Sequence, residues 1–142
     1  HFARFLVEQG ICKDTSQVFK NYLIEGKPGY VPHLWATLDD AVFWIKDAGG
    51  VAVIAHPGRY KLSPMQMDAL YQHFKELGGL AIEVITGSNS PDQYQQYANI
   101  AQQYGFMASR GSDFHDPRES YIDLGNLPHL PDHLTPVWSM FQ

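Results

Sequence analysis

Two short segments of the sequence place groups that could do chemistry close together. In the first, Gly111-Ser112-Asp113-Phe114-His115, an aspartate and a histidine stand two residues apart. In extended backbone, residues i and i+2 project to the same side, so Asp113 and His115 face one space. A carboxylate and an imidazole are both ligands of divalent metal ions. We therefore predict that both side chains bind metal, although a D-x-H motif by itself more often marks a surface turn.

The second segment, 51–60, reads V-A-V-I-A-H-P-G-R-Y. An apolar run typical of a buried parallel strand ends at His56, and Arg59 follows in a Pro-Gly loop. His56 is a third candidate metal ligand, and it could also protonate a leaving oxygen as the catalytic residue. Arg59 could bind a phosphate through paired hydrogen bonds. Arg110 and Arg118 flank the first segment, and solvated surface charge is the alternative interpretation of all three arginines.

The chemistry of these groups together is that of a metal-dependent hydrolase. Divalent ions held by imidazole and carboxylate lower the pKa of bound water and bind the oxygens of a phosphoryl group. Three ligands do not complete a centre of two or three metals. The remaining ligands are therefore expected from residues outside this chain.

The elements that must position these residues alternate between apolar strands and helices from Thr37 onward. Strands are expected to begin near positions 51, 80 and 106, with spacings of 29 and 26 residues. This is the length that a strand, a helix and two short loops need. Right-handed crossovers place such strands side by side and parallel, so that their carboxyl ends share one edge. Ligands bind at that edge in parallel sheets, and His56, Asp113 and His115 lie at it or just beyond it.

The periodicity and capping signals predict the other elements. Helices are expected over 1–8, 14–25, 37–48, 64–77 and 90–104, and the first 35 residues form a small helical subdomain. A short strand is expected over 121–125, and the apolar residues of 137–141 are expected to pack on the body. Glu83 stands inside the predicted strand 80–85, where a buried carboxylate is costly unless it is paired. A role facing the site and a structural role in an ion pair both stay open for it.

Composition limits the ligands and the setting. The formal net charge of -5 disfavours a domain that binds long nucleic acid through its backbone. The absence of a signal peptide or a long apolar run gives no support for secretion or membrane insertion. The single cysteine, Cys12, excludes an internal disulfide and favours a reducing, cytoplasmic location. The chain begins at His1, without an initiator methionine and inside an expected helix, so we interpret it as part of a longer protein.

Three segments together resemble a known family. They are A-H-P-G-R-Y at 55–60, G-S-D-F-H at 111–115 and H-F-A-R-F-L-V-E at 1–8. They are similar to the C-terminal half of the PHP-domain phosphoesterases, the polymerase and histidinol phosphatase superfamily. The nearest branch is TrpH/YciV, which contains 3',5'-nucleoside bisphosphate phosphatases and the 5'-to-3' exoribonuclease called ribonuclease AM.

The resemblance implies a fold and a site. The fold class is α/β, a partial, distorted (β/α)7 barrel, in which 1–35 is a helical insertion and 36–142 is the C-terminal β/α part. The family's centre holds two or three ions, commonly Mn, with Zn, Fe or Mg as alternatives. By motif, Asp113 and His115 match metal ligands, His56 matches a ligand or catalytic contact, and Arg59 and His1 match substrate-binding positions. The family's N-terminal H-x-H motif is absent, so this piece alone is expected to bind metal weakly and to be inactive.

The expected function is hydrolysis of phosphate from 3',5'-nucleoside bisphosphates, 5'-to-3' trimming of short RNA, or both. The partner is then a nucleotide or the 5' end of a short RNA rather than a long duplex or a membrane. One alternative is a phosphatase for a small metabolite such as histidinol phosphate. Another is a non-catalytic PHP domain that binds partners or stabilises a polymerase.

Overall fold

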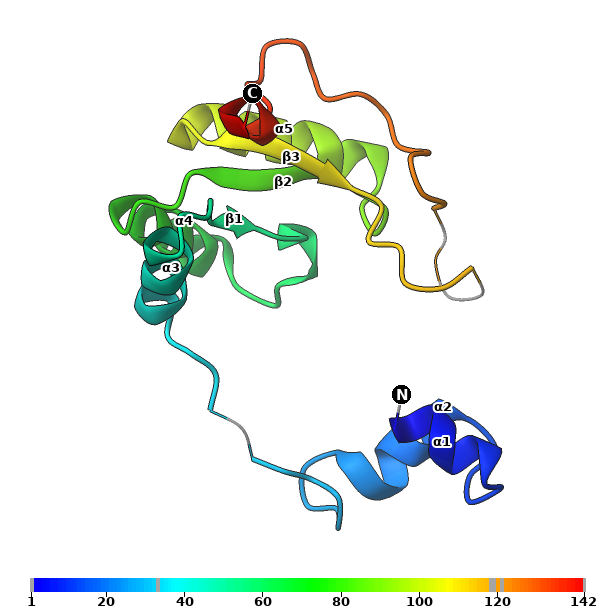
Figure 1. Cartoon of the computed structure of the whole chain (residues 1–142). Helices are drawn as coiled ribbons and strands as arrows, with labels where there is room; N and C mark the ends of the chain where they lie inside the picture. The colour runs from blue at the N-terminus through cyan, green and yellow to red at the C-terminus, as the bar shows by residue number, and fades with distance from the viewer. Residues whose placement is uncertain (1, 33, 118–119, 121, 142) are drawn as a thin grey trace. The chain divides into compact units, whose positions relative to one another are not determined.

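The computed structural model describes residues 2–32, 34–117, 120 and 122–141. It divides into two compact units, His1–Trp35 and Ala36–Gln142 (Figure 1). The first unit consists of the helices α1 (Phe2–Glu8) and α2 (Thr15–Val18) and the π-helical turn η1 (Phe19–Leu23). Its small core contains Ala3, Cys12 and Val18. That this unit is an insertion into a barrel stays a prediction.

The second unit is built on a parallel sheet of three strands, β1 (Val53–Ile54), β2 (Ala81–Thr86) and β3 (Met107–Gly111), in the order β1-β2-β3. Ile54 pairs with Ile82, and Ile82 pairs with Ala108. The prediction of three adjacent parallel strands is confirmed. β1 is shorter than the expected 51–55. The described residues show this small parallel sheet, and they do not show the complete seven-stranded barrel.

Three helices connect and cover the strands: α3 (Leu38–Asp47), α4 (Pro64–Glu76) and α5 (Pro91–Tyr104). Each begins at a capping residue, at Thr37 and Ser90 as expected and at Ser63 in addition. The side chains of Thr37 and Ser63 accept hydrogen bonds from backbone N–H groups of the first turn, and Ser90 begins a capping box. α5 lies along β2 and β3 (Figure 1). The core between helices and sheet is apolar and aromatic and includes Ile54, Tyr71, Phe74, Ile82, Val84, Tyr97, Ala101, Tyr104, Phe106 and Ala108.

Of two expectations about the C-terminal segment, one is wrong. The predicted strand over 121–125 is wrong, because 122–125 form a bend and a turn, and Tyr121 lies outside the described residues. The Asp123 carboxylate accepts a hydrogen bond from the N–H of Leu124 at 2.8 Å, and such local bonds compete with a strand ladder.

The tail packs on the body, and η3 (Val137–Phe141) contacts β3 as expected, together with residues that precede it. Leu134 is buried, and the N–H of Ala108 donates to the carbonyl of Thr135 at 2.8 Å, so the tail lies beside β3. Trp138 and Phe141 are 40% and 69% exposed. The reason is that the tail docks by backbone pairing beside β3 before the last 3₁₀ turn, η3 (Val137–Phe141), begins. Among the helices described, none is both long enough and apolar enough to cross a lipid bilayer.

Candidate metal and phosphate site

Two of the predicted site residues have an unusual backbone conformation. His56, between β1 and the 3₁₀ turn η2 (Pro57–Arg59), has φ 33° and ψ 57°, and Asp113, just after β3, has φ 54°. Within the described part of the chain they are the two non-glycine residues with positive φ. A side chain in this region costs about 1–2 kcal/mol, and such strain is concentrated at functional sites. The strain therefore selects two residues that the motifs had also selected.

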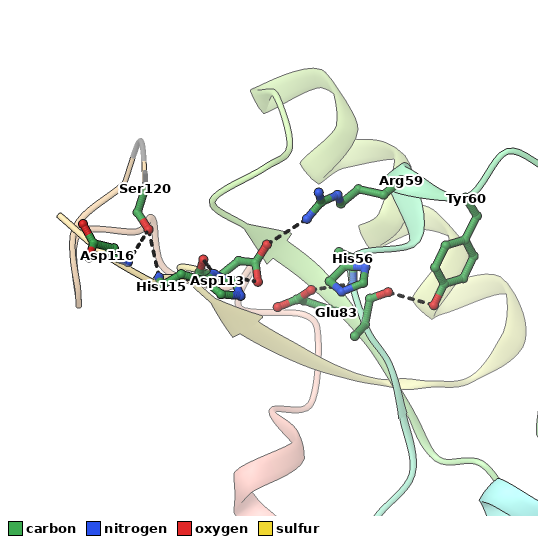
Figure 2. A network of polar contacts seen from close by, with 9 residues as sticks. His56, Arg59, Tyr60, Glu83, Asp113, His115, Asp116 and Ser120 are labelled. Atoms are coloured by element: carbon green, nitrogen blue, oxygen red, sulfur yellow. Dashed lines mark hydrogen bonds and ion pairs between the residues drawn. The ribbon is translucent and has the colours of Figure 1, made fainter. Parts of the chain in front are cut away.

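A carboxylate holds the strained turn at His56. The backbone N–H of His56 donates to Oε2 of Glu83 at 2.6 Å, from the neighbouring strand β2 (Figure 2). Hydrogen bonds that involve a charged group contribute about 1.5–3 kcal/mol, enough to offset the strain. Burial raises the pKa of the Glu83 carboxyl, and the charge of Asp113 raises it further, while the hydrogen bond from His56 lowers it. Glu83 is thus within electrostatic range of both turns.

An ion pair joins the loop after β1 to the loop after β3. Nη1 of Arg59 lies 3.1 Å from Oδ2 of Asp113 (Figure 2). The Arg59 side chain is 59% exposed and that of Asp113 is 24% exposed. A pair this accessible contributes about 0–1 kcal/mol to stability. Its effect is to direct the guanidinium and the carboxylate toward the same space.

His115 follows on the same loop as Asp113. Its Nδ1 lies 2.7 Å from the carbonyl oxygen of Asp113, and this oxygen can only accept a hydrogen bond. The proton of a neutral imidazole is therefore on Nδ1, which leaves the Nε2 lone pair available to a ligand. Metal-bound histidines commonly make such a second hydrogen bond to a carbonyl. The hydroxyl of Ser120 accepts from the N–H of His115 at 2.9 Å and shapes the loop.

A cleft of about 470 Å³ opens at this edge of the sheet, and its volume is in the usual range for small-molecule sites. It is lined by Arg59, Gly87, Ser88, Ser112, Asp113, His115 and Ser120. The loops after β2 and β3 meet closely here. The N–H of Gly87 donates to the carbonyl of Gly111 at 3.2 Å, and a Cβ at position 87 would lie 2.1 Å from the carbonyl oxygen of Ser112.

The side chains at this edge are of the chemical types that bind divalent cations. Nδ1 of His56 is buried and has no hydrogen-bond partner among the described residues, so its lone pair is available to a metal ion. The Asp113 carboxylate and Nε2 of His115 add one hard and one borderline ligand, the set preferred by Mn, Zn or Fe. Among the residues described, no three His, Cys, Asp or Glu side chains lie close enough to hold an ion together. The chain therefore offers individual ligands rather than a finished centre.

The structure places the predicted residues as follows. It brings Arg59 and Asp113 together and places His56 at the same edge through Glu83, with His115 next along the loop. Arg110 instead donates to the carbonyl of Pro128 at 2.7 Å. His1 and Arg118 lie outside the described residues.

Some residues of the cleft were not singled out by the sequence. Ser88, Ser112 and Ser120 line it. Ser112 stands within the G-S-D-F-H segment, and Ser88 follows the expected strand 80–85 by three residues. Their hydroxyls add hydrogen-bond donors and acceptors beside the Arg59 guanidinium.

Comparison with known proteins finds relatives along the whole chain. The chain is 50% identical over 138 residues to the 3',5'-nucleoside bisphosphate phosphatase of Chromobacterium violaceum. The aligned region covers 97% of this chain and 48% of that protein. It is also 46% identical over 142 residues to the 5'-3' exoribonuclease Rnm of Escherichia coli K12. This aligned region covers 100% of this chain and 48% of that protein. The resemblance read from the motifs is confirmed by these relatives. The chain spans about half the length of the curated relatives it matches.

Two solved structures also match nearly the whole chain. An amidohydrolase from C. violaceum, with bound sulfate and no metal, matches with a TM-score of 0.79 and 49% identity over 99% of this chain and 48% of that chain. A candidate metal-dependent phosphoesterase from Bifidobacterium adolescentis matches with a TM-score of 0.65 and 27% identity over 98% of this chain and 46% of that chain. No family model matches the sequence.

Proposed function

We propose that this chain, similar to half of a nucleoside bisphosphate phosphatase and of 5'-3' exoribonucleases, is the C-terminal half of a metal-dependent phosphoesterase. Its substrates would be 3',5'-nucleoside bisphosphates, the 5' end of short RNA, or both. In the whole protein the chain would contribute one side of a distorted (β/α)7 barrel, with 1–35 as a helical insertion. The observation that carries the proposal is the pair of strained residues, His56 and Asp113, at the edge that Arg59 and Glu83 connect.

Each residue has a role in this proposal. His56, Asp113 and His115 would hold part of a cluster of two or three divalent ions, Mn first, with Zn, Fe or Mg as alternatives. Such ions polarise a phosphoryl group and make water a better nucleophile at neutral pH. Arg59 would bind a substrate phosphate through its guanidinium fork.

Hydrolysis of a phosphate ester breaks the bond between phosphorus and the ester oxygen, and that oxygen then needs a proton. A histidine side chain can supply such a proton as a general acid. His56 would be this proton donor where it does not serve as a metal ligand, because one imidazole nitrogen cannot do both. His1 would contact substrate, as a prediction from the motif alone.

The cleft and the charge favour a small or short substrate. A volume of about 470 Å³ suits a nucleotide, and a net charge of -5 gives little attraction to a long nucleic-acid backbone. The cytoplasmic location stays a prediction from the single cysteine.

The test is phosphate release from 3'-phosphoadenosine 5'-phosphate by the full-length protein, with Mn added and after chelation. We expect activity that depends on metal, and none from the 142-residue chain alone. A 5'-phosphorylated short RNA and histidinol phosphate, assayed beside the bisphosphate, separate the three substrate classes. Faster turnover of histidinol phosphate would replace the nucleotide proposal. Full activity after Asp113→Ala would exclude the proposed centre and favour a non-catalytic role for this half of the protein.

A further inference from the structure

The feature that the proposed function leaves unexplained is a carboxylate inside a strand. Glu83 lies in the middle of β2, and it is neither exposed nor in an ion pair in the described structure. Its Oε2 accepts a hydrogen bond from the backbone N–H of His56 at 2.6 Å. His56 lies two positions after the end of β1. The sequence left open whether Glu83 faces the site or forms a structural ion pair. In the structure its carboxylate accepts a hydrogen bond from the backbone of a site residue instead of forming an ion pair.

The strand register explains why this bond is needed. The pairing of β1 with β2 ends at Ile54 and Ile82, and from there the chain leaves the sheet. The N–H of His56 therefore has no partner in the ladder, and the Glu83 side chain supplies one. This hydrogen bond also offsets the strain of the left-handed conformation of His56.

The opposite strand leaves room for the carboxylate. A Cβ at Gly111 in β3 would lie 3.1 Å from Oε1 of Glu83, which is tighter than ordinary contact. The absence of a side chain at 111 thus allows the carboxylate to lie between the two loops that carry His56 and Asp113 (Figure 2). The same three strands that form the edge of the site also orient Glu83.

We propose that Glu83 is a positioning residue that fixes the backbone, and through it the imidazole direction, of His56. The proposal rests on the proposed function for its catalytic meaning, but the geometry it asserts is independent of activity. It requires a hydrogen-bond acceptor at the end of the side chain and does not require a negative charge. A metal ligand or a general base at this position would require the charge.

Three variants of the full-length protein separate these roles. Glu83→Gln keeps an acceptor oxygen at the same distance, Glu83→Met keeps the length without an acceptor, and Glu83→Ala removes both. Asp47→Ala, which removes an exposed carboxylate at the end of α3, is the control. Circular dichroism and thermal unfolding establish which variants are folded.

The first readout is hydrogen-deuterium exchange of the peptide that spans 55–60 in metal-free protein. We expect the His56 amide to exchange about tenfold faster or more in Glu83→Met and Glu83→Ala, and at close to the wild-type rate in Glu83→Gln and Asp47→Ala. Unchanged exchange in a folded Glu83→Met or Glu83→Ala would overturn the proposal. This readout holds even where the wild type shows no phosphatase activity, so failure of the proposed function is distinguished from failure of this inference.

The second readout is steady-state kinetics of the metal-loaded protein. We expect Glu83→Gln to retain kcat within about threefold, and Glu83→Met to lose at least about tenfold in kcat with a smaller change in KM. A Glu83→Gln variant as inactive as Glu83→Ala, with lower bound Mn, would show that Glu83 acts through its charge and would overturn the positioning role.

Discussion

Nη1 of Arg59 lies 3.1 Å from Oδ2 of Asp113, so the residue proposed to bind phosphate is paired with a residue proposed to bind metal. The pair joins the turn after β1 to the loop after β3 (Figure 2), and both residues line the cleft. A phosphate that enters the cleft would compete with Asp113 for the guanidinium. Substrate binding and the availability of the carboxylate are therefore coupled in the proposed mechanism.

Replacement of Arg59 by alanine tests the phosphate contact. A charge-assisted hydrogen bond contributes about 1.5–3 kcal/mol, so we expect KM for the bisphosphate to rise about tenfold to a hundredfold. The measurement is steady-state kinetics of the full-length protein. Lys61→Ala, which removes the same charge two residues away at an exposed position, should change KM less than about twofold. Equal effects of both variants would reduce the role of Arg59 to general charge.

Asp113→Asn tests the metal ligand with little disturbance of the backbone. Asparagine tolerates positive φ, so the turn at 113 should persist and the melting temperature should change by a few degrees at most. The loss of a negatively charged ligand should lower Mn binding at least about tenfold, measured by isothermal titration or by metal analysis after dialysis. Asp132→Asn, an exposed change in the tail, is the control and should bind Mn like the wild type. Unaltered Mn binding in Asp113→Asn would remove Asp113 from the ligand set.

Gly87→Ala tests the close contact of the loops after β2 and β3. The added methyl group would lie 2.1 Å from the carbonyl oxygen of Ser112 and 3.3 Å from Cβ of Ile122, and the Ser112 backbone cannot easily move away. We expect a loss of about 1–3 kcal/mol in unfolding free energy, measured by urea denaturation, and a weaker bisphosphate interaction. Ser88→Ala changes the next residue, which is exposed, and should stay within about 0.5 kcal/mol of the wild type. Wild-type stability of Gly87→Ala would mean that the two loops lie farther apart than described.

The strands and their shared edge could be predicted because apolar runs, helical periodicity and loop lengths are local properties of the sequence. The partners at the edge could not. The bond from His56 to Glu83 depends on where the β1–β2 ladder stops, and the pairing of β2 with β3 shifts between Glu83 and Ile85. The strand expected over 121–125 failed for the converse reason, since the Asp123 side chain satisfies the backbone locally. Strand register and the hydrogen bonds between side chains and backbone depend on tertiary contacts, which the local sequence pattern does not contain.

The last prediction concerns a bond between α4 and α5. The hydroxyl of Tyr104 donates to Oδ1 of Asp68, and this hydrogen bond, with a further contribution from burial, raises the pKa of Tyr104 to about 12. A group whose pKa is higher in the folded state stabilises the fold fully below its unfolded pKa, here 10.0, and loses that contribution as pH rises toward 12. Tyr104→Phe should therefore lose about 1 kcal/mol of unfolding free energy at pH 7, with a smaller difference from the wild type above pH 11. Urea denaturation at both pH values measures this. Burial also raises the pKa of Tyr71, Tyr60 and Tyr97, so absorbance at 295 nm should show one fewer late-titrating tyrosinate in the variant than in the wild type. Tyr30→Phe, a change in the other unit, should affect neither measurement, and a Tyr104 that ionises near pH 10 would show that the bond to Asp68 does not form in solution.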